Sequence, residues 1–80
     1  MKRRQQYGNA NRIGKTVCRL REKRGLKQKE LLAMLQAKGV DIGESGISQL
    51  EGQNRAATDI EIQALAEIFK ISIEELYNND

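Results

Sequence analysis

The 80-residue sequence contains no His, no Trp, no Pro and only one Cys, Cys18. Without His, the chain cannot form a Ser-His or Cys-His catalytic pair, and one Cys allows neither a zinc finger nor an internal disulfide. The Asp and Glu residues are scattered, and no Gly-rich phosphate loop is present. We therefore expect the protein not to be an enzyme and to need no metal and no cofactor.

Long hydrophobic runs are also missing. No apolar segment approaches the ~20 residues that span a bilayer, and the basic start leads into no apolar signal core. We expect a cytoplasmic protein with no membrane partner, and no small-molecule ligand is evident. Hydrophobic residues make up 39% of the chain and charged residues 31%, which is compatible with one small helical domain.

Charge is distributed unevenly along the chain. Residues 1–40 hold twelve Lys and Arg against two Glu, a net charge of +10, whereas residues 41–80 hold two basic against nine acidic residues, a net charge of −7. A polyanion such as nucleic acid is the first partner that this asymmetry suggests. Ordinary helix-surface charge is the alternative.

Apolar residues recur at helical spacing in three segments, and they predict the core. These residues are Ile13, Val17 and Leu20; Leu31, Leu32 and Leu35; and Ile62, Leu65, Ala66 and Phe69. The pattern predicts five helices, beginning at residues 12, 28, 44, 58 and 72, and Gly25 and Gly39 act as stops. We expect a turn over residues 40–43. The fold class is therefore all-α.

Capping residues mark three of the helix starts. Asn11 is a suitable N-cap for the first helix. Thr58 with Glu61, and Ser72 with Glu75, have the spacing of capping boxes, in which side chain and backbone satisfy each other. The last short helix should close the core with two apolar residues, Ile73 and Leu76.

The order of the elements around Gly39 is typical of a helix-turn-helix. A helix and a glycine-containing turn precede a short helix over residues 44–51, whose outer face offers Ser45, Ser48 and Gln49 while Ile47 and Leu50 face inward. Such a second helix can enter the ~12 Å major groove of DNA. Small helical domains that bind proteins share the layout.

The ordered set of motifs resembles the phage-repressor and Cro-like helix-turn-helix family, also called XRE. It comprises Ile13-Gly14, Val17, Leu20-Arg21, Arg24-Gly25-Leu26, Gln28, Leu31, Ile47-Ser48-Gln49-Leu50-Glu51, Thr58-Asp-Ile-Glu-Ile, Leu65-Ala66 and Ile71-Ser72-Ile73-Glu-Glu-Leu76. The resemblance implies a five-helix, lambda-repressor-like fold over residues 12–77 that binds double-stranded DNA. Residues 1–11 would then be a flexible basic arm and residues 78–80 a tail.

The resemblance also implies roles for individual residues. It assigns base readout to Glu44, Ser45, Ser48 and Gln49. It assigns contacts with DNA phosphates to Gln28, Lys29, Asn54 and Arg55. Four of these residues have a plainer alternative. Gln49 can be an ordinary solvated glutamine, Gln28 a residue that only starts its helix, Glu44 a carboxylate that only favours the helix dipole, and Arg55 a partner of Asp59 in a surface salt bridge. Cations of the arm, Lys2, Arg3 and Arg4, can contact DNA or only keep the chain soluble.

Arg21 and Glu51 match a pair that this family often joins between the first helix and the end of the third. We expect a bidentate contact that orients the third helix without touching DNA. The chain departs from the family elsewhere: 19 steps separate Gln28 from Ile47 where about 14 are usual, so the second helix or the turn is longer. Leu32 stands at a usual Ala, and Gly43 and Gly46 should weaken the third helix.

The leading interpretation is a sequence-specific DNA-binding transcriptional regulator, with repression as its first expected mode. A weak homodimer through the fourth and fifth helices is the expectation by family analogy. The alternative is an antitoxin-like or antirepressor-like protein-interaction module on the same fold. Salt dependence separates the two, because contacts to phosphates weaken steeply as salt rises.

Overall fold

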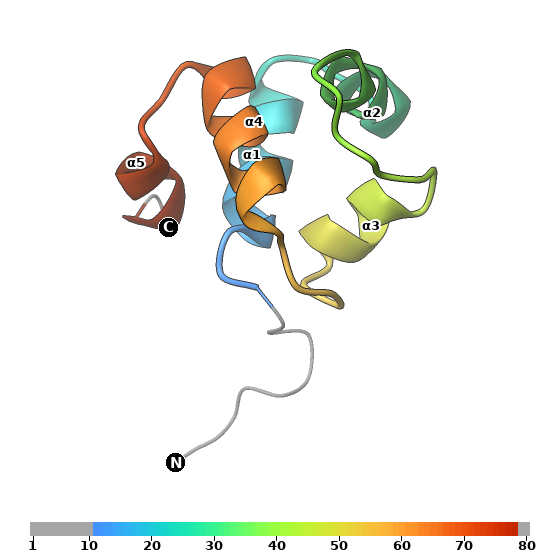
Figure 1. Cartoon of the computed structure of the whole chain (residues 1–80). Helices are drawn as coiled ribbons and strands as arrows, with labels where there is room; N and C mark the ends of the chain where they lie inside the picture. The colour runs from blue at the N-terminus through green and yellow to red at the C-terminus, as the bar shows by residue number, and fades with distance from the viewer. Residues whose placement is uncertain (1–10, 79–80) are drawn as a thin grey trace.

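The computed structural model describes residues 11–78, and these residues fold into five α-helices (Figure 1). The helices are α1 (Gly14–Lys23), α2 (Gln28–Ala37), α3 (Gly46–Glu51), α4 (Asp59–Phe69) and α5 (Ile73–Asn78). No strand occurs within residues 11–78. The predicted all-α class is therefore confirmed, while nearly all of the predicted basic arm lies outside the described residues.

The ends of the first two helices follow the predicted signals closely. The Oδ1 atom of Asn11 accepts hydrogen bonds from the backbone N–H groups of Ile13 (3.1 Å) and Gly14 (2.7 Å), although α1 begins two residues later than expected. Gly25 (φ +69°) and Gly39 (φ +84°) adopt left-handed conformations directly after α1 and α2. Glycine adopts this conformation without a steric penalty, so both stop signals are confirmed.

Both predicted capping boxes are present. The Thr58 hydroxyl accepts from the N–H of Glu61 (3.1 Å), and the Thr58 N–H donates to the Glu61 carboxylate (3.0 Å). At α5, the Ser72 hydroxyl and the Glu75 carboxylate exchange the same two bonds, at 3.0 and 2.8 Å. These contacts satisfy backbone donors that a helix start otherwise leaves unpaired.

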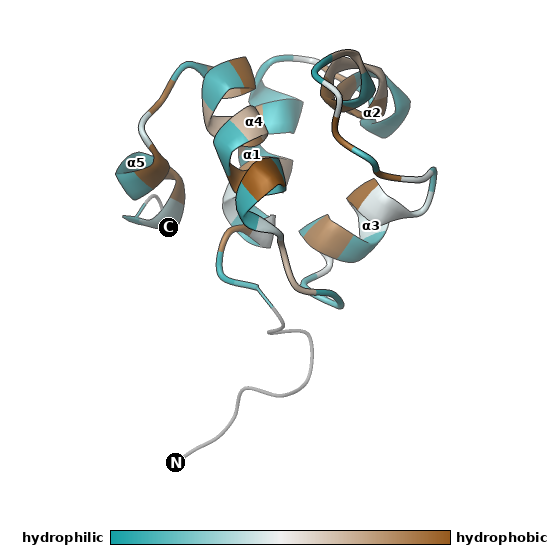
Figure 2. Cartoon of the chain, in the orientation of Figure 1, coloured by the Kyte–Doolittle hydropathy of each residue, from teal (hydrophilic) through white to brown (hydrophobic). Residues whose placement is uncertain are grey.

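One continuous core joins all five helices. Its largest fully buried side chains are Phe69, Ile13, Leu31, Leu35, Ile47, Leu50, Leu65, Leu76 and Val17. Most of them belong to the stripes that the sequence predicted, and Figure 2 shows hydrophobic and hydrophilic residues alternating along the helices. Ile73 is an exception: it is 45% exposed, so the expectation that it closes the core is wrong. At the start of α5 its side chain lies on the outer side, and Leu76 alone is buried.

The connection between α2 and α3 is longer than a tight turn and belongs to the core. The extra residues lie in this connection, because α2 itself has only ten residues. Val40 and Ile42 are both buried, with the exposed Asp41 between them. Alternate burial is typical of extended chain, and each buried side chain contributes about 1.5–3 kcal/mol. The sequence expectation of a simple turn over residues 40–43 missed this contribution.

The third helix is shorter than expected, because residues 44 and 45 form a turn ahead of it. The N–H of Gly46 donates to the carbonyl of Gly43 (2.9 Å) at this turn. A Cβ atom at Gly46 would overlap the side chain of Ile42. Glycine at this position therefore allows the connection to pack against α3, which offsets its low helix propensity.

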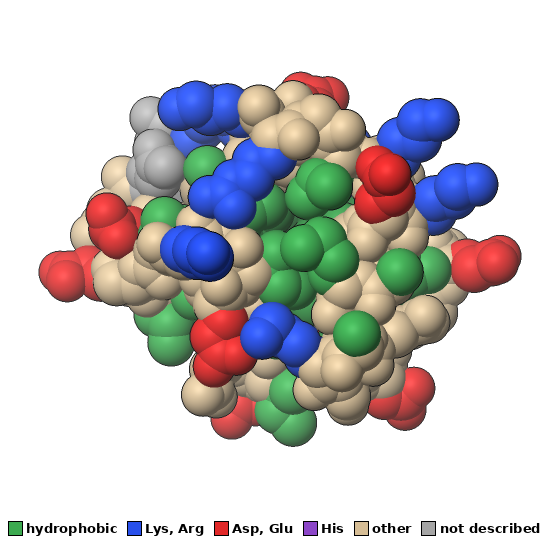
Figure 3. All heavy atoms as spheres, turned by 90° about the horizontal axis from the view of Figure 1, so that it is seen from above, with side chains coloured by type: hydrophobic (Ala, Val, Ile, Leu, Met, Phe, Trp, Pro, Cys, Tyr) green, Lys and Arg blue, Asp and Glu red, His purple; other side chains and the backbone are tan. Residues whose placement is uncertain are grey.

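Helices α1 and α4 lie in the middle of the fold, and the other three helices lie on either side of them. In Figure 1, α2 and α3 lie on one side of these two helices and α5 lies on the other. On the face seen in Figure 3, hydrophobic side chains gather at the centre with basic and acidic side chains around them. Within residues 11–78, no helix has the length and apolar character needed to cross a membrane.

Candidate nucleic-acid interface

The short helix α3 presents a polar outer face. Ile47 and Leu50 are buried against the core, and Ser48 and Gln49 are exposed. The Ser48 hydroxyl donates to the backbone carbonyl of Ser45 (3.0 Å), while no described residue holds the Gln49 carboxamide. Gln49 therefore has its amide and its carbonyl available for a ligand, as a base-reading residue requires.

Glu44 and Ser45 lie just before α3 rather than within it. Both are exposed, and the backbone of Ser45 accepts the first hydrogen bond of the helix, from the N–H of Gln49 (3.0 Å). The prediction of a helix over residues 44–51 is wrong at its start for this reason. Asp41, earlier in the connection between α2 and α3, is a further exposed carboxylate.

The predicted pair between Arg21 and Glu51 is present and bidentate. Arg21 Nε lies 2.6 Å and Nη2 lies 3.2 Å from the two carboxylate oxygens of Glu51. The side chains are only 11% and 6% exposed. Arg21 Nη1 also donates to the carbonyl of Leu26 (2.7 Å). The guanidinium group therefore fastens the end of α3 to α1 and to the chain that enters α2.

The same cluster affects the titration of two groups. The hydrogen bond from Arg21 to Glu51 is the main reason that the pKa of Arg21 is raised. Burial, followed by the negative charge of Glu51, raises the pKa of the Cys18 thiol above its ordinary value. Cys18 is thus mainly in the thiol form, which is less nucleophilic than a thiolate.

Gln28 stands beside the carboxyl end of α3, and Lys29 follows it in α2. Gln28 Nε2 donates to the Glu51 carboxylate (3.0 Å), and the adjacent Lys29 is exposed in the first turn of α2. The structure thereby brings one of the expected phosphate-binding residues, Gln28, into contact with α3. One amide proton of Gln28 is taken by Glu51, and the other is available for a further acceptor.

Arg55 has a different partner from the one weighed in the sequence. Its guanidinium nitrogens lie 3.0 and 2.6 Å from the two carboxylate oxygens of Glu61, so the proposed salt bridge to Asp59 is wrong. The reason is local: Asp59 accepts from the N–H of Ile60 (2.9 Å), whereas Glu61 turns back as part of the capping box. Arg55 remains 27% exposed, and Glu61 is 3% exposed.

Opposing effects act on the Glu61 carboxyl group. Burial alone raises its pKa, but the hydrogen bonds from Arg55 and from the backbone of Thr58 outweigh burial and hold the pKa below its ordinary value. Arg55 shows the reciprocal effect, since its bond to Glu61 raises its pKa. The pair is charged at neutral pH, and it fixes the loop that follows α3.

Asn11 links the start of α1 to the end of α3 and to the loop that follows it. Asn11 caps α1 through Oδ1, and its Nδ2 atom donates to the backbone carbonyls of Leu50 (3.1 Å) and Arg55 (2.8 Å). The backbone carbonyl of Asn11 accepts from Gln53 Nε2 (3.0 Å). Sequence reasoning identified Asn11 only as a cap. Nothing in its local pattern indicates a contact 39 or 44 residues away.

A close backbone approach accompanies this link. A Cβ atom at Gly14 would overlap the carbonyl of Leu50, so glycine lets the start of α1 lie directly against the end of α3.

Asn54 lies in the loop after α3 and is exposed, and its backbone N–H donates to the carbonyl of Gln49 (2.9 Å). Lys2, Arg3 and Arg4, the expected arm contacts, lie outside the described residues.

Together these contacts make one surface from three parts of the chain. The polar face of α3, the loop with Asn54 and Arg55, and the start of α2 are held in place by hydrogen bonds and by the buried Arg21–Glu51 ion pair. Residues 11–78 contain no cluster of three side chains suited to a metal ion. The surface therefore offers carboxamides, hydroxyls and cations at fixed positions, which suits recognition of a polar, anionic partner.

Comparison with known proteins adds no relative: no protein family, no curated protein and no solved structure matches the chain.

Proposed function

We propose that this protein is a sequence-specific double-stranded DNA-binding regulator of transcription, acting as a repressor on a Cro-like, XRE-type helix-turn-helix fold. The observation that carries the proposal is the exposed polar face of α3 on a helix that is held rigidly from behind. A helix in the major groove needs both features, because its side chains must meet base edges at fixed positions. Gln49 supplies a carboxamide that can bind adenine through two hydrogen bonds.

Expected phosphate contacts near the carboxyl end of α3 complete the arrangement. Lys29 and Gln28 are at the start of α2, and Asn54 and Arg55 are in the loop after α3. Such contacts set the register of a protein on DNA, and the base contacts then supply specificity. The proposal needs no cofactor, and repression follows where the bound site overlaps a promoter.

The decisive experiment is selection of bound duplexes from a randomised DNA pool at about 0.15 M salt, where non-specific attraction is already partly screened. We expect enrichment of a defined motif. Gln49→Ala should then relax the preference at one base pair, at a cost of about 1–3 kcal/mol. Asn78→Ala is the matched control, because Asn78 is an exposed carboxamide on α5. Recovery of no motif would reject the proposal.

One observation favours a second candidate function, a protein-interaction module of the antitoxin or antirepressor type. Glu44 is exposed at the amino end of α3, and Asp41 is exposed in the connection that leads to it, and such carboxylates would repel a nearby DNA phosphate. On that interpretation the partner is a basic protein. Its binding would lack the slope of about −0.9 in log affinity against log salt for each neutralised phosphate.

A further inference from the structure

A line of basic side chains runs along the outer surface of α1. Lys15, Arg19 and Lys23 are exposed and stand four residues apart. Residues at this spacing lie one above the other on a helix, so the three side chains form a line about 12 Å long. Arg12 is also exposed and comes just before α1. We refer to Lys15, Arg19 and Lys23 as the α1 ridge.

The α1 ridge faces away from α3. The side of α1 that faces α3 carries Arg21, which binds Glu51, and Gly14, where a Cβ atom would overlap a carbonyl of α3. Arg19 and Lys23 are each two residues from Arg21, and two residues turn a helix by about 200°. The polar face of α3 points away from the core as well, so the two surfaces lie on different sides of the molecule. A straight duplex that lies along α3 therefore does not reach the ridge.

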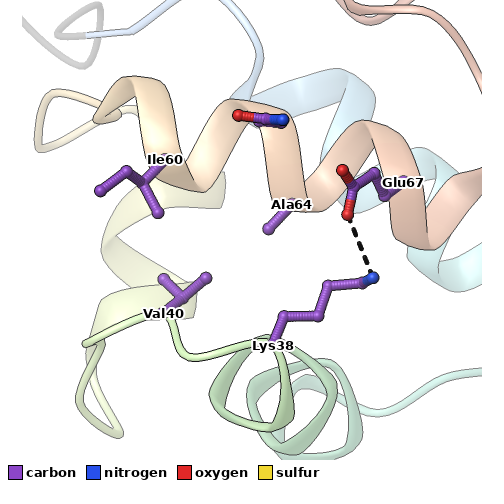
Figure 4. Close-up of a pocket in the computed structure, with 6 residues that line it drawn as sticks. Lys38, Val40, Ile60, Ala64 and Glu67 are labelled. Carbon is purple, nitrogen blue, oxygen red and sulfur yellow. Dashed lines mark hydrogen bonds and ion pairs between the residues drawn. The ribbon is translucent and has the colours of Figure 1, made fainter.

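The fold uses other cations of the chain for its own contacts, but not these. Four basic side chains are held within the described chain: Arg21 by Glu51, Arg55 by Glu61, Arg24 by the carbonyls of Ile68 and Phe69, and Lys38 by Glu67. The last pair stands across an open hollow between α4 and the chain that leaves α2 (Figure 4). Within residues 11–78, by contrast, no ion pair involves Lys15 or Lys23.

The charges of the ridge oppose the stability of α1. Like charges four residues apart repel each other on a helix surface. Lys15 also lies in the first turn, where the positive end of the helix dipole disfavours a cation, and that turn contains no acidic residue. Glu22 is on the same helix, but its carboxylate lies 3.9 Å from Arg21. Binding of an external anion would offset this repulsion.

The chemistry of the ridge selects the class of anion. A protein partner is usually held by an apolar or aromatic centre within the interface, and a lipid surface is held by an apolar helix face. The apolar residues of α1, among them Ile13 and Val17, are buried in the core and serve neither purpose. A nucleic-acid backbone requires only a line of cations, which is what the ridge offers.

We propose that the α1 ridge binds the phosphates of a second DNA segment while α3 occupies the first. One domain then holds two pieces of DNA on different sides. The first contact rests on the proposed function, whereas the contact between ridge and phosphates does not depend on α3. The second contact carries no sequence preference, because cations on the backbone do not read bases.

Capture of one duplex by another measures this bridging. A mixed-sequence duplex is held on beads, and the protein-dependent retention of a labelled copy is measured at about 0.05 M salt. Lys15→Gln/Lys23→Gln should retain at least about ten-fold less than the unmodified chain, because two phosphate contacts are lost. Lys38→Gln/Lys70→Gln removes the same charge elsewhere and should retain nearly as much as the unmodified chain. Equal capture by the two double variants, or no capture by the unmodified chain, would overturn the proposal.

Affinity for a single duplex separates this proposal from the proposed function. Lys29→Gln reports on the side of the molecule that carries α3. A chain that binds one duplex through Lys29 and captures no second one would overturn the ridge and leave the proposed function intact. A chain whose binding to one duplex depends on Lys15 and Lys23 but not on Lys29 would support the ridge and overturn the role of α3.

Poly-glutamate is the probe for an acidic protein partner. If it displaces the labelled duplex at a lower concentration of charge than unlabelled duplex does, the ridge prefers a polypeptide and the assignment to DNA is overturned. Thermal unfolding checks the fold of each variant. The midpoint of Lys15→Gln/Lys23→Gln should not fall, because both side chains are exposed and repulsion along the ridge is reduced.

Discussion

The guanidinium group of Arg55 and the buried carboxylate of Glu61 form a bidentate pair that ties the loop after α3 to the first turn of α4. The loop residue is also held through its carbonyl, which accepts from Asn11. Arg55 is thereby a structural residue whose partly exposed side chain stands beside the candidate interface. The Arg55 side chain can therefore stabilise the loop and also present positive charge to a ligand.

Glu61 should make stability depend on pH in the acidic range. Its folded pKa lies below the unfolded value, so its contribution is complete above the unfolded pKa of about 4.3 and is lost as pH falls through the folded pKa. Urea unfolding should show the stability difference between the unmodified chain and Glu61→Gln shrinking below about pH 4.5. Glu75→Gln is the control, because Glu75 occupies the same capping-box position but is exposed. The same shrinkage in both variants would argue against the Arg55 pairing as its cause.

Arg21→Ala should lower the free energy of unfolding by about 3 kcal/mol, because it leaves the buried Glu51 carboxylate without its main partner. Arg21→Lys should recover only part of this loss, since an ammonium group cannot form the two parallel bonds. Lys38→Ala breaks an exposed pair and should cost less than about 1 kcal/mol in dilute solution. Denaturant midpoints measure all three, and equal losses for Arg21→Ala and Lys38→Ala would contradict the burial argument.

Asn11→Asp should separate the capping role of this residue from its bridging role. Aspartate keeps the acceptor for the start of α1 but places an anion against the carbonyls of Leu50 and Arg55, at a cost of about 2 kcal/mol near pH 7. A protonated carboxyl can donate, so the deficit should narrow near pH 4. Asn54→Asp, on an exposed residue, should show little change at either pH. A deficit in Asn11→Asp that does not respond to pH would exclude the bridging account.

Gly46→Ala should destabilise the chain although alanine favours helices, because the added methyl group overlaps the side chain of Ile42. Ile42→Ala removes that side chain, so the double variant should lose at least about 1 kcal/mol less than the two single losses combined. Gly46→Ala combined with Ile71→Ala tests an apolar residue between α4 and α5, and its effects should add. Additivity in both pairs would remove the Ile42 explanation for this glycine.

Lys29→Gln should reduce the salt dependence of DNA binding if Lys29 neutralises one phosphate. The slope of log affinity against log salt should fall by about 1, and the sequence preference should not change. Lys70→Gln removes an exposed cation from the end of α4 and should leave the slope unaltered. Titrations on one duplex at several salt concentrations provide both slopes. An equal change for the two variants would indicate only a general effect of net charge.

Local signals predicted much of what the structure contains. The core stripes, the capping boxes at Thr58 and Ser72, and the stops at Gly25 and Gly39 depend on residues within a few positions of each other. Helical periodicity and backbone capping act over that range, so the sequence alone determines them. The Arg21–Glu51 pair was predicted only because of the family resemblance, since 30 residues separate its members.

Contacts between distant segments were decided by the tertiary structure. The pairing of Arg55 with Glu61 rather than Asp59 is a local exception, because the capping box turns the Glu61 carboxylate toward the loop. The packing of the helices brought Asn11 into contact with Leu50. It also buried Val40 and Ile42 in the core and left Ile60 exposed. Hydrophobic burial is non-directional, so a pattern shows that a residue is apolar but not which neighbour covers it. The tertiary structure therefore decided how α3 is held and where the hollow beside α4 is left open.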